Sequence, residues 1–112
     1  MFRPFEDAAR TSFTEPVTQS ARRSSRAARR AGAYAALCFK AFGGRVADWI
    51  TLNEPWCSAA LGYANGEHAP GRREAAATEP YLAGHHMLLA HASSVREFRA
   101  GGHAGQVPRD AM

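Results

Sequence analysis

The sequence predicts an α/β fold made of a helix, a buried strand, a long loop and a second helix. Three observations support this prediction. An amphipathic stretch that begins near residue 31 ends at a pair of glycines, a nearly continuous apolar run follows at residues 48–53, and a second amphipathic stretch begins at Thr78. Helical patterns that alternate with short apolar runs are typical of a parallel sheet covered by helices.

The first predicted helix covers residues 31–42. Its apolar residues recur at i, i+3, i+4, i+7 and i+8, which places them on one stripe of the helix surface. These residues are Tyr34, Leu37, Cys38, Ala41 and Phe42. The glycine pair Gly43 and Gly44 is expected to end the helix, because glycine readily adopts the left-handed conformation of a helix C-terminus.

The predicted strand covers residues 48–53. Residues 49–52, Trp-Ile-Thr-Leu, are all strand formers, and their nearly unbroken apolar character is typical of a strand covered on both faces. Pro55 lacks a backbone donor and is expected to hold Glu54 in an extended conformation. Asn53 and Glu54 therefore stand at the carboxyl end of a strand, where α/β folds place their catalytic groups.

Residues 54–77 form a long connection, which is unusual in a compact domain unless the loop shapes a site. A short helix is expected at residues 56–61. The second long helix has Thr78 as its predicted cap, with Glu79 and Pro80 in its first turn.

The second long helix should end at the glycine pair 101–102. Its buried side is expected to include a set of apolar residues spaced along one face. These residues are Leu88, Ala92, Val95 and Phe98.

The excess charge lies in the first 33 residues, which hold seven arginines and three acidic residues of a chain with net charge +4. We therefore divide the chain into a basic leader without regular structure (1–30), a folded segment (31–102) and a tail (103–112). The leader is interpreted as a flexible segment without its own function, an organelle transit peptide, a nucleic-acid-binding tail or a cloning or reading-frame artefact. Nucleic-acid binding is disfavoured because no aromatic residue is interleaved among the arginines.

The sequence also indicates the cellular compartment in which the protein is expected. The sequence has no apolar run near 18 residues and no secretory apolar core at its start, so we expect a cytoplasmic protein without a membrane span. Its two cysteines, Cys38 and Cys57, are too few for a disulfide framework and are expected to be free thiols.

Four ordered blocks of the chain resemble glycoside hydrolase family 1, the β-glucosidase group. The block with the most informative motif is Thr51-Leu52-Asn53-Glu54-Pro55, which is similar to the TLNEP signature of that family. The other blocks are Tyr34 to Gly43 with Arg45-Val46, Gly62-Tyr63 to Arg72, and Thr78 to Val95. The resemblance covers residues 33–99 and implies a piece of a (β/α)₈ TIM barrel containing a helix, the fourth strand, its catalytic loop and the next helix.

The resemblance implies a role for two residues. Glu54 is the expected general acid/base, and Asn53 is expected to hydrogen-bond the 2-hydroxyl of the sugar. The implied substrate is a terminal β-linked glucose or a related sugar, and no cofactor or metal is implied. A (β/α)₈ barrel needs about 250 residues, and the family's nucleophile, a glutamate in a TENG-like motif, has no counterpart here. We therefore expect an inactive fragment that is either partly disordered or self-associating through exposed barrel faces.

Several alternatives stay open. Trp56 is either a sugar-stacking platform or, as we prefer, a packing residue, and Tyr63 and His68 either line the site rim or brace the loop. His85, His86 and His91 lack the i, i+4 spacing of a helical zinc pair. The alternative function is a non-catalytic interaction protein, whose basic leader binds nucleic acid or an anionic surface, or which docks onto an intact barrel.

Overall fold

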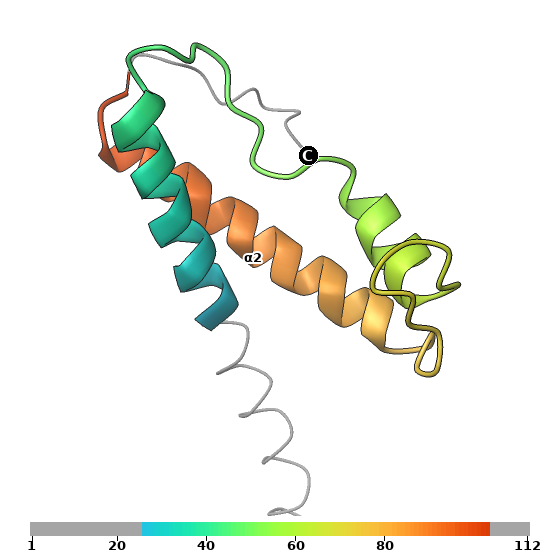
Figure 1. The fold of residues 1–112 in the computed structure, drawn as a ribbon. Helices are drawn as coiled ribbons and strands as arrows, with labels where there is room; N and C mark the ends of the chain where they lie inside the picture. The colour runs from blue at the N-terminus through green and yellow to red at the C-terminus, as the bar shows by residue number, and fades with distance from the viewer. Residues whose placement is uncertain (1–25, 104–112) are drawn as a thin grey trace, which may run out of the picture.

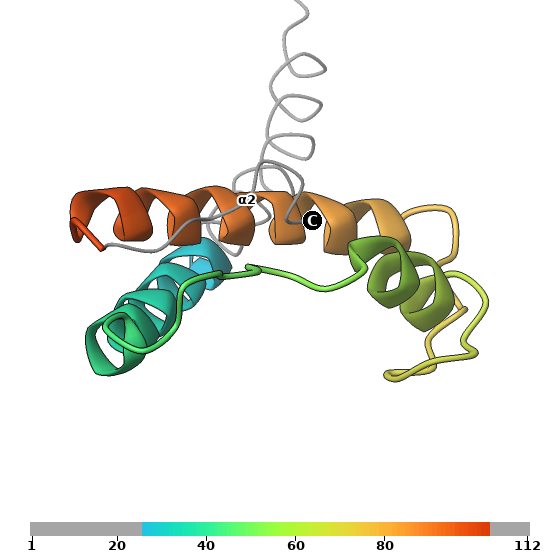
Figure 2. The same cartoon turned by 90° about the horizontal axis from the view of Figure 1, so that it is seen from above.

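The computed structural model describes residues 26–103, which form two long helices and a short helix (Figure 1). The first helix runs to residue 42, with residues 26–42 described. The short helix η1 (Cys57–Leu61) is a π-helical turn, and α2 (Glu79–Ala100) is the longest element. Figure 2 shows that the first helix and η1 lie on the same side of α2, near its opposite ends, and are joined by an extended segment.

The end of the first helix lies where the glycine pair predicts it. The Gly43 amide donates to the Phe39 carbonyl at 2.8 Å, and the amides of Arg45 and Val46 both donate to the Phe42 carbonyl, at 2.8 and 3.0 Å. These bonds close the last turn and redirect the chain. Residues 26–30, which the sequence assigned to the leader, are helical in the structure. The remainder of the leader and residues 104–112 of the tail lie outside the described residues.

The first helix and α2 cross at a point where both carry small residues. Gly32 and Ser93 are buried, and a side chain at Gly32 would overlap the Ser93 hydroxyl. The absence of a Cβ at this position therefore lets the two backbones approach closely. Further along, the two helices pack through larger side chains, Phe39 of the first helix and Phe98 of α2.

An aromatic cluster forms the core at the C-terminal ends of the two long helices. Phe39 and Phe98 are the two buried hydrophobic residues of the described chain, at 4% and 7% exposure. The Phe39 ring meets Trp49 at 4.8 Å and Phe98 at 5.1 Å between centroids, both edge to face, and His103 at 5.4 Å. Edge-to-face geometry is favourable because the positive ring edge meets the negative ring face. Phe39 therefore joins both helices to the segment between them.

The predicted apolar stripe of the first helix does not face this core. Tyr34, Leu37 and Phe42 are 70%, 64% and 49% exposed, while Gly32 and Phe39 are buried. The helix forms as predicted, and its apolar stripe is largely exposed, as expected of a fragment with exposed barrel faces. The stripe has no sheet to cover within the described residues, and the two helices pack instead through the face that allows the closest approach.

The prediction for α2 was right at one end of the helix and wrong nearer the middle. Phe98 is buried and Val95 half-buried, whereas Leu88 is 54% exposed and Ala92 is also exposed. The first helix crosses α2 near Ser93 and covers only the C-terminal part of it. The other end of α2 contacts η1, and Leu88 stays exposed.

The predicted strand at residues 48–53 is absent. Within residues 26–103 the only strand-type pairing is a single bridge residue, Asp48, and the segment after it is extended without forming a ladder. A strand is stabilised by hydrogen bonds to a neighbouring strand, and an isolated one is not stable in water. Residues 49–52 have the composition of a barrel strand, but no other described segment forms a strand beside them. The described chain is therefore mostly helical.

Replacement of Phe39 by alanine should unfold much of this arrangement, because it removes the one ring that contacts Trp49, Phe98 and His103. We expect a loss of about 3 kcal/mol in the free energy of unfolding, measured by urea titration with far-UV circular dichroism. The control is Leu37→Ala on the exposed face, which should change stability by no more than about 0.5 kcal/mol. Equal effects of the two substitutions would contradict the assignment of the core.

Candidate functional site

Asn53 and Glu54 lie where the extended segment enters a helix. Both are exposed, and the helical turn that leads into η1 begins at Pro55. Proline suits this first helical position, because its missing amide would have had no partner there. The two residues thus lie at the end of residues 49–52, as predicted, but no β-ladder among the described residues fixes their direction.

The backbone of Glu54 adopts the left-handed conformation, with φ of 43°, and is not extended as predicted. The chain must reverse direction between the extended segment and the helix. Proline disfavours the right-handed helical region for the residue before it, and Glu54 makes this turn with a positive φ. The Glu54 carbonyl then accepts from the Ser58 amide at 3.3 Å. A non-glycine residue in this region carries strain of order 1 kcal/mol, and such strain is concentrated at functional sites.

The carboxylate of Glu54 accepts a hydrogen bond from the Cys57 thiol, with 3.2 Å between Sγ and Oε2. Cys57 follows Glu54 by three residues, about one helical turn, and this i, i+3 spacing brings its thiol close to the Glu54 side chain. The carboxylate raises the pKa of Cys57 above its usual value, first by accepting the thiol hydrogen bond, with smaller contributions from burial and from its negative charge. Cys57 and Cys38 are both free thiols, as expected.

A second hydrogen bond ties the extended segment to α2. The Thr51 hydroxyl and His91 Nδ1 lie 2.6 Å apart, in a partly buried position. This contact fixes the segment two residues before Asn53 against the middle of α2. From the sequence, His91 was considered only as a possible metal ligand. No local sequence pattern indicates a hydrogen bond between residues that lie 40 positions apart.

The loop after η1 folds back on that helix. The His68 amide donates to the Leu61 carbonyl at 3.0 Å, and the Arg72 amide donates to the Gly62 carbonyl at 2.9 Å. Gly66 and Gly71 have φ of 72° and 75°, which side-chain-bearing residues rarely adopt. The loop is therefore an ordered structure that packs beside the helix following Glu54, as a site-forming loop must be.

An ion pair joins this loop to the start of α2. The guanidinium of Arg72 donates to both carboxylate oxygens of Glu79, with 2.8 Å between Nε and Oε2. The pair lowers the pKa of Glu79 and raises that of Arg72, in each case mainly through the side-chain hydrogen bond. Thr78 precedes α2 as predicted but makes no capping bond, because its hydroxyl donates to the Ala75 carbonyl at 3.3 Å.

The three aromatic residues whose roles the sequence left open, Trp56, Tyr63 and His68, have different surroundings. Trp56 is 67% exposed, so the interpretation that it packs into the loop was wrong. Tyr63 is half-buried beside η1, while His68 is exposed and contributes to the loop through its backbone. Trp56 and Glu54 are therefore both accessible at the start of the same helix.

The histidines of α2 are spread around that helix. His85 is exposed and its ring lies 6.0 Å from that of His86, whereas His91 is turned toward Thr51. Residues 26–103 contain no group of three or more side chains placed to hold a metal ion, and no helix among them is long and apolar enough to cross a membrane.

The fold and the site together define the class of the protein. A helix, an extended TLNEP segment with an exposed carboxylate, an ordered loop and a long helix follow one another as in the hydrolases that cleave glycosidic bonds. The family model described as "Glycosyl hydrolase family 1" matches residues 23–110. The chain belongs to this family.

The curated relatives are β-glucosidases of plants and fungi. Beta-glucosidase 26 of Oryza sativa subsp. japonica is 56% identical over 72 residues, which cover 59% of this chain and 14% of the relative. Furostanol glycoside 26-O-beta-glucosidase of Hellenia speciosa is 51% identical over 74 residues, covering 59% of the chain and 13% of the relative. The chain thus spans about one seventh of the length of the relatives it matches.

A solved structure agrees with this membership. The rice Os3BGlu6 beta-glucosidase superposes with a TM-score of 0.66 at 39% identity, covering 71% of this chain and 20% of that one. The path of the chain is therefore that of a segment of a TIM-barrel enzyme, even though the strand itself is not formed here.

Replacement of Glu54 by glutamine should lower the pKa of Cys57, because it removes a negative charge and a strong acceptor beside the thiol. In a Cys38→Ser background with one thiol left, reaction with a disulfide reagent across pH 7–10 should show its midpoint at lower pH in the Glu54→Gln chain. Glu67→Gln is the matched control, since it removes the same charge elsewhere in the loop. An unshifted midpoint would show that the thiol does not face Glu54.

The bond between Thr51 and His91 should appear as coupling in a double-mutant cycle. Thr51→Val keeps the shape of the side chain and removes the hydroxyl, and His91→Ala removes its partner. From a hydrogen bond of this kind we expect about 1 kcal/mol of coupling in the free energy of unfolding. The pair Thr51→Val with His85→Ala should be additive, and additivity in both cycles would refute the bond.

Proposed function

We propose that this chain supplies half of the catalytic site of a retaining β-glucosidase, and that the isolated chain hydrolyses nothing at a useful rate. Glu54 is the general acid/base of that site and Asn53 binds the sugar. The observation on which the proposal rests is the family match over residues 23–110, with the TLNEP signature intact at residues 51–55.

The chemistry assigns the two residues different tasks. The Glu54 carboxylic acid donates its proton to the glycosidic oxygen as the bond to the anomeric carbon breaks, and later removes a proton from the attacking water. The Asn53 amide hydrogen-bonds the 2-hydroxyl of the sugar, an interaction that strengthens as positive charge develops on the ring. Their adjacency in the chain lets one backbone turn present both groups to the same sugar.

Retaining hydrolysis also needs a second carboxylate as nucleophile, about 5–5.5 Å from the acid. The family's nucleophile motif has no counterpart among these 112 residues. The exposure of Glu54 fits this incomplete state, since nothing in the described chain encloses a sugar around it. Without the nucleophile no glycosyl-enzyme intermediate forms, and the proton donor by itself has little to act on.

The proposed substrate is a β-glucoside with glucose at the non-reducing end. The curated relatives quoted above carry β-glucosidase names, and one is named for its action on furostanol glycosides. The residues that would distinguish glucose from related sugars, or one aglycone from another, belong to other parts of the barrel. The proposal therefore extends to the class of substrate and no further.

The purified chain should release no nitrophenol from nitrophenyl β-glucoside above the rate of the Glu54→Gln chain. A full-length family 1 β-glucosidase serves as the positive control under the same conditions. Turnover by the chain that Glu54→Gln abolishes would overturn the inactivity of the fragment.

The role of Glu54 is tested by grafting residues 34–99 into the matching region of a full-length relative. In the grafted enzyme, Glu54→Gln should reduce kcat/KM by at least about 100-fold for alkyl glucosides, whose poor leaving groups require protonation, and much less for dinitrophenyl glucoside. Asn53→Ala should reduce the rate with both substrates. Equal losses for both leaving groups in Glu54→Gln would contradict an acid/base role.

A further inference from the structure

Within residues 26–103, the side chain of Glu54 has the Cys57 thiol as its hydrogen-bond partner, with 3.2 Å between Sγ and Oε2. The ion pairs in this part of the chain join Arg72 to Glu79 and Arg96 to Glu97, so no cation there pairs with Glu54. Glu54 is exposed, whereas Cys57 is half-buried. The thiol is therefore the described group that limits how the Glu54 carboxylate is oriented.

The helical turn after Glu54 forms this contact from neighbouring residues. The Ser58 amide donates to the Glu54 carbonyl at 3.3 Å, and Cys57 belongs to the same turn. The backbone of Glu54 has φ of 43°, a conformation that few residues with a side chain adopt. Backbone and side chain of Glu54 are thus both held by residues within one turn of it. Because the contact is local and needs no sheet, it should persist when the segment is part of a complete barrel.

The Cys57 thiol keeps its proton at neutral pH. The Glu54 carboxylate raises the pKa of Cys57, first by accepting its hydrogen bond, and burial and the carboxylate charge raise it further. The thiolate is the reactive form of cysteine, so a raised pKa makes Cys57 a poor nucleophile. A thiol that keeps its proton remains a hydrogen-bond donor. Cys57 is therefore suited to hold the Glu54 carboxylate and not to attack a substrate.

The thiol makes the two carboxyl oxygens of Glu54 different from each other. Oε2 accepts from Cys57, whereas Oε1 is left for another partner. A protonated carboxyl group has one carbonyl oxygen, which accepts hydrogen bonds, and one hydroxyl oxygen, which donates. A donor at Oε2 favours the carbonyl form of that oxygen and so places the acidic proton on Oε1. The same thiol bond also suits the ionised carboxylate, because both of its oxygens accept.

We propose that Cys57 is a positioning residue for the acid/base reaction, whose thiol holds Oε2 of Glu54 so that Oε1 carries the transferred proton. This inference rests on the proposed function of Glu54. In the acid step the Oε1–H bond breaks as the proton bonds to the glycosidic oxygen, which keeps the electron pair of its broken bond to the anomeric carbon. The carboxylate nucleophile of the complete barrel supplies a new electron pair to that carbon. The thiol keeps its proton and its bond to Oε2 throughout.

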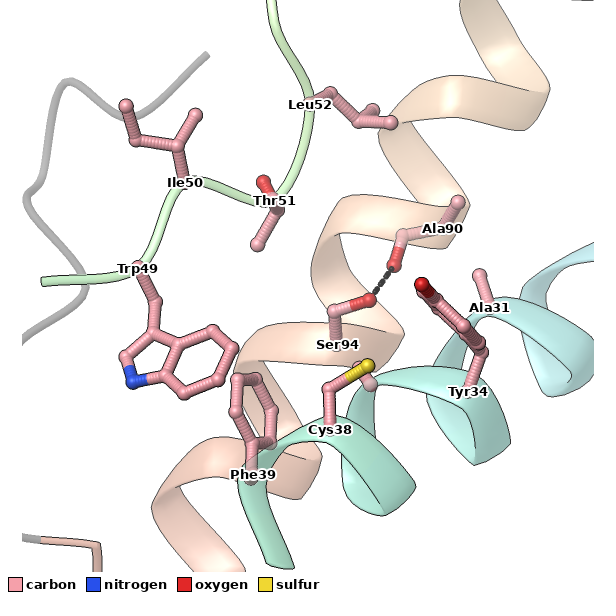
Figure 3. A pocket seen from close by; sticks show the side chains of 11 residues that line it. Ala31, Tyr34, Cys38, Phe39, Trp49, Ile50, Thr51, Leu52, Ala90 and Ser94 are labelled. Carbon is pink, nitrogen blue, oxygen red and sulfur yellow. Dashed lines mark hydrogen bonds between the residues drawn. The ribbon is translucent and has the colours of Figure 1, made fainter. Parts of the chain in front are cut away.

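The other thiol of the chain provides a matched comparison. Cys38 lies on the first helix and lines an apolar groove of about 430 Å³ formed by this helix, residues 49–52 and α2 (Figure 3). Neither Glu54 nor Cys57 is among the residues that line this groove. Cys38 is a free thiol and half-buried, as Cys57 is. Its removal therefore takes away an equivalent sulfur without changing the surroundings of the proton donor.

The test uses the full-length relative that carries residues 34–99 of this chain, so that the nucleophile is present. Cys57→Ala should lower kcat/KM for an alkyl glucoside at least about five-fold, as expected from the loss of one hydrogen bond. The value for dinitrophenyl glucoside should stay within about two-fold, because its leaving group departs without protonation. Cys57→Ser should recover most of the loss, since its hydroxyl also donates. Cys38→Ala is the control and should change neither value.

The outcomes separate the role of Cys57 from the function on which it rests. Equal losses for both leaving groups in Glu54→Gln would overturn the acid/base role of Glu54 and the role of Cys57 with it. If Glu54→Gln separates the leaving groups while Cys57→Ala lowers both activities equally, or lowers neither, the role of Cys57 alone is overturned. A Cys57→Ser enzyme no more active on the alkyl glucoside than Cys57→Ala would overturn it as well. Retained activity on dinitrophenyl glucoside shows that each variant is folded.

Discussion

The contact of Phe39 with the rings of Trp49 and Phe98 is the interaction on which the described structure depends. Centroid distances of 4.8 and 5.1 Å with nearly perpendicular planes place both partners in favourable edge-to-face geometry. Phe39 belongs to the first helix, Trp49 to the extended segment and Phe98 to α2. The three parts of the chain therefore meet at one side chain, and the position of Glu54 relative to α2 follows from it together with the bond between Thr51 and His91.

The missing neighbours explain most of what is unusual in this structure. Barrel strands are stabilised by adjacent strands, and the helices of a barrel cover the sheet those strands form. Within residues 26–103 no such sheet forms, so residues 49–52 are extended without a ladder and Tyr34 and Leu37 remain exposed. The local features that need no sheet persist, namely the two long helices, the turn at Gly43 and the ordered loop with its ion pair between Arg72 and Glu79.

The same incompleteness separates membership of the family from activity. The chain matches family 1 over most of its length but spans about one seventh of its curated relatives. Retaining hydrolysis depends on two carboxyl groups at a fixed separation, and such a separation can only be set by parts of a barrel that are present together. The proposed role of Glu54 therefore depends on barrel segments that are not among the described residues.

The sequence by itself determined the features that depend on local or short-range chemistry. The glycine pair at 43–44 marked a helix end, Thr78 to Pro80 marked a helix start, and residues 51–55 marked the family. Only the tertiary structure decided which faces are buried and which segments pair. Gly32 and Phe39, and not Tyr34 and Leu37, face α2, because burial depends on which partner is present to pack against. The bond between Thr51 and His91 likewise arises from how distant parts of the chain meet, which spacing along the sequence does not encode.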